Sequence, residues 1–224
     1  MLANFSFRAI ADYLPLFTQG FIATLWLSVI SFTGALAVGI VLCAMNLKAS
    51  RVISAPAKAY IDAVRATPLL VQLYFLYFGL PRLGIVLPEV VVGILALSLN
   101  SGAYIAEIIR AGILSVPRGQ VEAALSSGMT YPQRMRLVVL PQAFRVTIPP
   151  LLGQAIVLVK DSALLSLISV MELTRAGQLL ASDRFMPAEG FITVAVCYLL
   201  LYYGLKGLAG LSARSLGAQP VQRT

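Results

Sequence analysis

Five long apolar stretches divide the 224 residues of this chain. A hydrocarbon layer of about 30 Å needs roughly 20 apolar residues to cross it as an α-helix. The strands of a membrane barrel are about half as long and alternate in polarity, so helices are the spanning form that fits these stretches. The sequence therefore predicts an all-α integral membrane protein with five transmembrane helices, within 17–47, 57–80, 88–113, 148–170 and 188–211.

The second stretch is less regular than the others, because Lys58, Asp62 and Arg65 occupy its first part. Thr67–Pro68 follows these charges. A proline lacks a backbone N–H and disfavours helical backbone in the residue before it. The pair therefore predicts a break that frees backbone groups to line a cavity, and a simple kink is the alternative interpretation.

The basic residues fall mainly on one side of the predicted spans, and this bias sets the orientation of a membrane protein. The N-terminus is expected outside and the C-terminus inside, so the net charge of +8 indicates topology rather than nucleic-acid binding. Only Arg8, Arg82, Arg175 and Arg184 lie on the outer side, where acidic residues offset them. The residues on or near the inner side are Lys48, Arg51, Lys58, Arg65, Arg110, Arg118, Arg134, Arg136, Arg145, Lys206, Arg214 and Arg223.

Several classes of function are excluded by what the sequence lacks. It has no histidine, and Cys43 and Cys197 both lie in apolar stretches, so we expect no disulfide framework, metal site or cofactor. No nucleophile–base pair of an enzyme can be assembled from these residues. A GxxxxGK[ST] phosphate-binding loop is also absent. The energy for any work must therefore come from an ion gradient or from another subunit.

A polar and basic segment interrupts the apolar chain between the third and fourth spans. Pro117 can begin a helix, Gly128 suits a left-handed helix end, and Thr130 and Gln133 have the spacing of a capping box. Pro141 is expected to stop the second helix. The segment therefore predicts two short helices joined by a glycine, outside the bilayer on the cytoplasmic side, where another protein docks.

Polar side chains on the third and fourth spans predict a substrate pathway. Asn100 and Glu107 share one face of the third span with Tyr104 beside it, and Asp161 lies on the fourth. Polar groups inside a bilayer are costly, so such faces turn toward protein or water. A purely structural role fits the charged residues equally well, with Asp161 neutralising a partner in the bundle and Glu107 pairing with Arg65 or Arg110.

The first span carries a stripe of hydroxyl groups at helical spacing: Thr24, Ser28 and Ser31. We expect Ser28 to face the same pathway. Small and hydroxyl residues at this spacing also mediate helix packing in membranes, and this second interpretation fits the stripe as well.

The hairpin also carries a recognisable motif. Glu122-Ala123-Ala124 is followed by Gly128, Val138 and Leu140-Pro141 at the spacing of the "EAA" pattern of importer permeases. The chain thus resembles the membrane permease subunits of ATP-binding-cassette (ABC) importers for polar amino acids, the group that includes histidine, arginine and glutamine permeases. The resemblance covers about residues 18–205 and includes RATPLLVQLYFLYFGLP at 65–81, LSLNSGAYIAEIIRAGI at 97–113, LPQAFRVTIPPL at 140–151 and KDSALLSLISVMELT at 160–174.

The resemblance implies a fold and a set of partners. The fold is that of a type I ABC importer permease, with residues 1–224 as a single transmembrane domain and a cytoplasmic coupling hairpin at about 115–145. The implied partners are a second permease subunit, identical or related, two ATP-binding-cassette ATPase subunits, and a periplasmic or lipid-anchored substrate-binding protein. The implied location is the bacterial cytoplasmic (inner) membrane. The residues that it implies for ATPase coupling are Glu122, Ala123, Ala124, Gly128, Leu140 and Pro141.

The function that we predict is ATP-driven import of polar amino acids by alternating access, with ATP hydrolysis in the partner subunits rather than in this chain. An ion-coupled secondary transporter is an alternative, which an odd number of spans without a visible repeat disfavours. A non-transport membrane scaffold is another, but it leaves the polar faces of the spans unexplained. The substrate-pathway residues are expected to be Thr67, Asn100, Tyr104, Glu107, Asp161 and Ser28.

Overall fold

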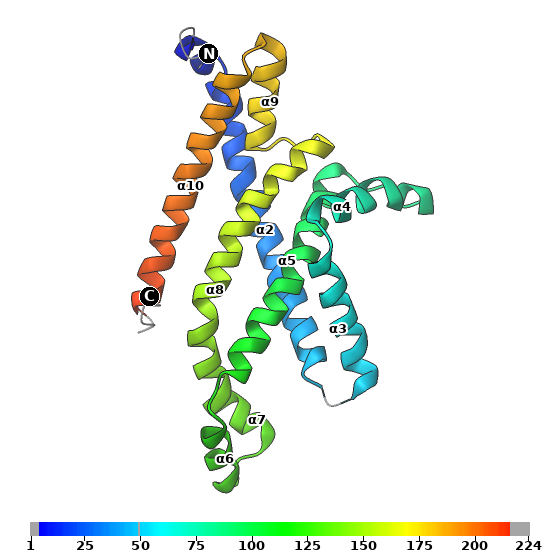
Figure 1. The fold of residues 1–224 in the computed structure, drawn as a ribbon, viewed down its shortest axis with the longest axis vertical. Helices are drawn as coiled ribbons and strands as arrows, with labels where there is room; N and C mark the ends of the chain where they lie inside the picture. The colour runs from blue at the N-terminus through cyan, green and yellow to red at the C-terminus, as the bar shows by residue number, and fades with distance from the viewer. Residues whose placement is uncertain (1–4, 49, 216–224) are drawn as a thin grey trace.

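The computed structural model describes residues 5–48 and 50–215, and all regular structure within them is helical (Figure 1). Arg223 and the other tail residues after 215 lie outside the described residues. The first helix, α1 (Phe7–Asp12), lies at one end of the molecule, and the last helix ends toward the other. Four described helices are long and apolar enough to cross a membrane, and a fifth crossing exists if one bent pair of helices counts as a single span.

The long helices α2 (Leu14–Asn46) and α5 (Glu89–Leu114) form the centre of the bundle. Glycines let their backbones approach closely, as is usual between membrane helices. A Cβ atom at Gly102 would lie 2.6 Å from Val38 Cγ1, and one at Gly39 would lie 2.5 Å from Ile105 Cγ2. Neither position therefore accepts a larger side chain without a shift of the helices.

The second predicted span is divided at Thr67–Pro68. The helix α3 (Arg51–Ala66) ends before this pair, and a second segment follows, composed of α4 (Leu69–Tyr74), the π-helical η1 (Phe75–Gly79) and the 3₁₀ turn η2 (Leu80–Leu83). The direction of the helix changes by 109° between the two segments. The predicted break is therefore confirmed as a sharp bend rather than a kink. Figure 1 shows the second segment leaving the bundle sideways.

The predicted hairpin follows α5 and protrudes beyond the other helices (Figure 1). It contains α6 (Arg118–Ser126) and α7 (Tyr131–Arg134). The chain then continues through the π-helical η3 (Met135–Val139) into α8 (Leu140–Asp161). The second helix of the hairpin and the next span are thus one helical segment.

The prediction that Pro141 stops a helix is wrong. The π turn widens the helix just before the proline, and the Leu140 N–H donates to the Met135 carbonyl, five residues back. A proline in a regular α-helix would remove a hydrogen bond and clash with the carbonyl four residues earlier. The wider turn accommodates Pro141 in the first turn of α8 without interrupting the helical path.

Three further elements complete the chain. The 3₁₀ helix η4 (Ser162–Ile168) extends α8, and the short helix α9 (Leu173–Arg184) packs against both α2 and the final helix α10 (Pro187–Ser215). Glu172 caps α9 and is fully buried, where its carboxylate accepts hydrogen bonds from the backbone N–H groups of Thr174 and Arg175 at 2.8 and 2.7 Å. The α9 helix is thereby fixed inside the bundle.

Candidate functional site

The turn of the hairpin is closed by backbone hydrogen bonds of its own residues. Gly128 has φ +76°, the left-handed conformation expected at this position. The Gly128 N–H donates to the Leu125 carbonyl at 2.9 Å and the Met129 N–H to the Ala124 carbonyl at 3.1 Å. These two bonds form a Schellman motif, which satisfies carbonyls left unpaired at the end of α6. The predicted glycine turn is confirmed.

The second helix of the hairpin begins with the predicted capping box. Gln133 Oε1 accepts from the Thr130 N–H at 2.9 Å. The hairpin is also attached to α8, because the Gln142 side chain donates to Gln120 Oε1 on α6. The hairpin is therefore a capped unit joined to the helix that continues from it.

The structure separates the predicted coupling residues into two groups. Glu122 and Ala123 are exposed on α6, and Leu140 and Pro141 are exposed at the start of α8. Ala124 is only 6% exposed. Burial of Ala124 leaves Glu122 and Ala123 as the surface that α6 offers to another protein, and the coupling role of Ala124 stays a prediction.

A second candidate region lies at the bend between α3 and α4. Pro68 has no N–H to donate to the Val64 carbonyl, its partner in a continuous helix. Gln72 Nε2 takes this place, at 2.9 Å from the Val64 carbonyl and 2.8 Å from Thr67 Oγ1. Gln72 Oε1 in turn accepts from Asn100 Nδ2 on α5 at 3.0 Å. We name Gln72, Thr67 and Asn100 the amide clamp.

The amide clamp contains two of the predicted pathway residues, Thr67 and Asn100. Thr67 is exposed at the bend, as a pathway residue must be, but its hydroxyl donates to the Ala63 carbonyl at 3.0 Å and accepts from Gln72. Asn100, only 5% exposed, has its amide turned toward Gln72, so it supports the bend rather than an open pathway. Sequence reasoning missed Gln72, although a lone amide five residues after Thr67 in an apolar stretch is a usable signal.

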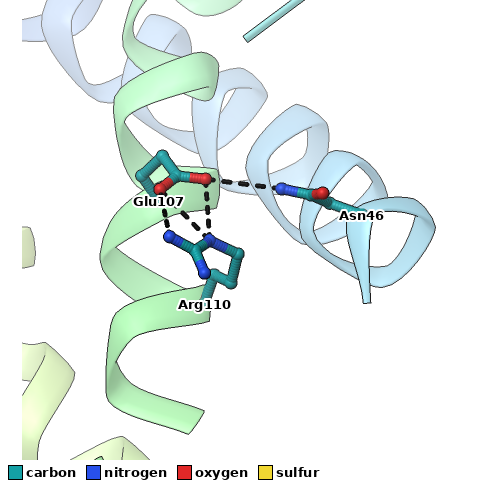
Figure 2. Close-up of polar contacts among 3 residues, drawn as sticks. All are labelled: Asn46, Glu107 and Arg110. Atoms are coloured by element: carbon teal, nitrogen blue, oxygen red, sulfur yellow. Dashed lines mark hydrogen bonds and ion pairs between the residues drawn. The ribbon is translucent and has the colours of Figure 1, made fainter. Parts of the chain in front are cut away.

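Two more pathway residues lie along α5 toward the hairpin end. Tyr104 has the Arg65 guanidinium of α3 over its ring, 5.4 Å from the ring centre. Glu107 pairs with Arg110, with 2.8 Å between Oε2 and the terminal nitrogen, and accepts a longer bond of 3.4 Å from Asn46 (Figure 2). The structural pairing with Arg110 is thus the one that forms, which leaves Glu107 little free capacity for a ligand.

Asp161 lies at the end of α8 and is half-buried. No described residue forms a hydrogen bond or a close ion pair with its carboxylate, and Lys160 beside it is exposed. Among the described residues, no hydrogen bond or ion pair joins Asp161 to the amide clamp. Of the two predicted pathway carboxylates, Asp161 is the one that keeps free acceptor capacity.

Ser28 is buried rather than open to a pathway. It is 5% exposed, and its hydroxyl has no hydrogen-bond partner among the described residues. Its neighbours in the stripe also face protein: Thr24 Oγ1 accepts from the Leu173 N–H at 3.1 Å, and the Ser31 carbonyl accepts from Ser98 at 3.1 Å. Burial of Ser28 favours the packing interpretation of the stripe, and a pathway role for Ser28 stays a prediction.

Comparisons with known proteins agree with this architecture. Residues 35–217 match the family described as "Binding-protein-dependent transport system inner membrane component". The chain is 38% identical over 190 residues to the "Probable glutamine ABC transporter permease protein GlnM" of Bacillus subtilis (strain 168), covering 85% of this chain and 88% of the relative. It is 36% identical over 200 residues to the "Glutamine transport system permease protein GlnP" of Escherichia coli (strain K12), covering 88% and 91%.

A solved structure supports the same assignment. The chain matches a protein in the "Crystal structure of an amino acid ABC transporter with histidines" with a TM-score of 0.90 and 38% identity, covering 94% of this chain and 98% of that chain. The predicted importer-permease fold is confirmed by this likeness, and the relatives are transport permeases rather than enzymes. The chain belongs to the family of inner membrane components of binding-protein-dependent transport systems, as an amino acid ABC transporter permease.

Proposed function

We propose that this chain is the permease subunit of an ATP-driven importer of polar amino acids in a bacterial inner membrane. It pairs with a second permease subunit, identical or related, and two ATP-binding-cassette ATPase subunits dock on the coupling hairpin. A periplasmic or lipid-anchored binding protein delivers the amino acid at the opposite end, where α1 and α9 lie. Names of relatives support this substrate class, since they include glutamine permeases and a transporter solved with histidines.

The observation that carries this proposal is the unbroken helical path from the hairpin into the membrane. Helical structure runs from Tyr131 to Ile168 and contains Asp161 near its far end. At 1.5 Å per residue, Tyr131 and Asp161 lie about 45 Å apart along this path. A displacement of the exposed hairpin by an ATPase is therefore passed along α8 to the interior of the bundle.

The distribution of charge supports the orientation that we propose, with the N-terminus outside. The hairpin end of the molecule carries Lys48, Arg118, Arg134 and Arg136, on the connection after α2 and on the hairpin itself. Basic residues favour the cytoplasmic side of a membrane. The N-terminus is therefore outside, the C-terminus inside, and the hairpin reaches the compartment that holds ATP.

Alternating access requires an element with two arrangements that a ligand or motor can bias. The bend at Thr67–Pro68 is this element, because side-chain hydrogen bonds rather than a continuous helix join α3 to α4 there. Loss of the Gln72 contacts would free α3 to move relative to α4. In this mechanism the ATPases move the hairpin and α8, and the bend opens or closes the pathway.

A bound amino acid needs an acceptor for its ammonium group and donors for its carboxylate. We assign the ammonium to Asp161, since Glu107 is occupied by Arg110. Arg65, exposed near the bend, is the donor that suits a carboxylate, whereas the Thr67 hydroxyl already donates to the Ala63 carbonyl at 3.0 Å.

The experiment is uptake by the assembled complex in proteoliposomes with the variant Glu122→Ala. Glu122 is exposed on the hairpin, and loss of one charged hydrogen bond of about 1.5–3 kcal/mol at the ATPase contact would weaken docking tenfold or more. Glu89→Ala is the matched control for ATPase binding, because Glu89 is also exposed but begins α5 at the end away from the hairpin. Unchanged uptake and unchanged ATPase binding in Glu122→Ala would remove this residue from the coupling mechanism.

A further inference from the structure

An apolar groove of about 780 Å³ lies where α2, α5 and the α7–α8 segment meet, next to the hairpin. The α5 side chains line it from within, and α2 and α8 form its two walls. The wall residues are substantially exposed, Ile40 by 56% and Phe144 by 62%, so no described part of the chain covers them. The side chains that define the groove are Leu36, Ile40, Ile109, Ile113, Leu140 and Phe144.

The length of this groove matches one leaflet of a bilayer. Its α2 wall runs from Leu36 toward the end of the helix at Asn46, and its α8 wall runs from Leu140 to Leu151. At 1.5 Å per residue these walls are about 15 and 16 Å long. Half of a hydrocarbon core of about 30 Å is similar. An acyl chain lying along the helices would therefore be covered over most of its depth in one leaflet.

The hairpin end of the groove carries polar and basic side chains. Lys48 and Tyr131 line the groove at this end, and none of its lining residues is acidic. The Arg134 guanidinium lies over the Tyr131 ring, 5.6 Å from its centre, and adds a second positive charge. Tyrosine is enriched at the level of lipid headgroups, and basic residues there attract anionic lipids. The groove thus has an apolar body and a cationic, aromatic mouth.

We propose that this groove binds one acyl chain of an anionic phospholipid from the leaflet next to the hairpin, with the headgroup phosphate at Lys48 and Arg134. The groove has its apolar body toward the bilayer centre and its cationic, aromatic mouth at the hairpin end, in the same order as the acyl chain and headgroup of a phospholipid. This match favours a lipid over a protein segment as the occupant. Because Tyr131 begins the second helix of the hairpin, the bound lipid also holds the hairpin against α2. The proposal concerns binding by this chain alone, so it does not depend on any ATPase partner.

The test is lipid binding by the purified chain, measured by native mass spectrometry with phosphatidylglycerol and phosphatidylethanolamine that carry identical acyl chains. We expect phosphatidylglycerol to be retained preferentially. Lys48→Ala should weaken its binding about fivefold, the factor for about 1 kcal/mol per basic residue near a lipid surface. Lys206→Ala is the matched control, because Lys206 lies on α10 and does not line the groove.

A second variant fills the groove itself. Ala44 lines the α2 wall and is exposed, so Ala44→Phe should displace the acyl chain and reduce the retention of phosphatidylglycerol, whereas Ala195→Phe on the exposed surface of α10 should not. Equal retention of the two lipids, or unchanged binding in both Lys48→Ala and Ala44→Phe, would overturn the proposal. The proposal would also fail if Ala44→Phe left lipid binding intact but prevented pairing of two permease chains, because the groove would then be an interface between permeases. If Ala44→Phe does not fold, the Lys48→Ala comparison decides.

Discussion

The hairpin reverses the chain and the α3–α4 bend redirects it. The hairpin is stabilised by local hydrogen bonds, and the bend by side-chain hydrogen bonds that include one to a distant residue. The hairpin turn is closed by backbone bonds and by the Thr130–Gln133 box, all within a short segment. The bend depends on the side chain of Gln72 and on Asn100, which is 28 residues further along the chain. Local backbone bonds make a unit that moves as one body, whereas a bend held by amide groups can change its angle when a few contacts break.

The largest expected effect is at the bend. Gln72→Leu keeps the side-chain volume but leaves the buried Asn100 amide N–H without its partner and removes the shorter of the two hydrogen bonds to the Val64 carbonyl. Each buried polar group left unpaired costs about 1–3 kcal/mol. We therefore expect a clearly lower midpoint of thermal unfolding in detergent, together with a loss of coupled uptake.

A double variant sharpens this prediction. Replacing both partners of a buried hydrogen bond by apolar groups costs less than replacing one. Gln72→Leu combined with Asn100→Leu should therefore recover part of the unfolding midpoint that Gln72→Leu loses. Strictly additive losses in the two single variants would show that the two amides are not coupled.

The next effect is at the hairpin turn. Gly128→Ala places a Cβ atom at φ +76°, and the left-handed conformation costs an L-residue about 1–2 kcal/mol. Gly119→Ala makes the same chemical change within α6, where alanine favours the helix. The first variant should lower ATP-driven uptake and the second should not, as measured in the assembled complex. Equal uptake in both would argue against a rigid turn as the coupling element.

A smaller effect is expected from the ion pair on α5. Glu107→Gln removes the charge that pairs with Arg110, but the two side chains are 23% and 35% exposed, so solvent weakens the interaction. Such partly exposed pairs contribute up to about 1 kcal/mol. Uptake in Glu107→Gln should stay close to that of the unchanged chain, while Asp161→Asn should abolish it. If Glu107→Gln abolished uptake of labelled amino acid and Asp161→Asn did not, Glu107 rather than Asp161 would be the residue that binds the substrate.

The smallest effect is expected on the first long helix. Ser28→Ala removes a buried hydroxyl that has no partner in the described residues, so stability should be unchanged or slightly improved. Uptake should also be unchanged, because Ser28 packs inside the bundle. A strong loss of uptake in Ser28→Ala would restore this residue to the pathway.

Features that depend on neighbouring residues could be predicted from the sequence, and features that depend on the packing of distant helices could not. The turn at Gly128, the capping box and the break at Thr67–Pro68 were predictable, because each depends on residues within a few positions. The continuation of the helix through Pro141 was not predictable, because it depends on the π turn at Met135–Val139, which has no local sequence pattern that we recognised. The Gln72–Asn100 contact, the burial of Ser28 and the inward face of Ala124 are set by how distant helices pack. Spacing alone identified these residues as polar or small but did not fix which face each would present.

The most direct test of ATP-driven transport through the hairpin is uptake of labelled polar amino acids into proteoliposomes. The purified chain is compared, under an imposed proton or sodium gradient, with the complex that also contains the ATPase subunits, the binding protein and ATP. We expect uptake only in the complex and only with ATP. Uptake by the chain alone, driven by the ion gradient, would contradict the proposed mechanism.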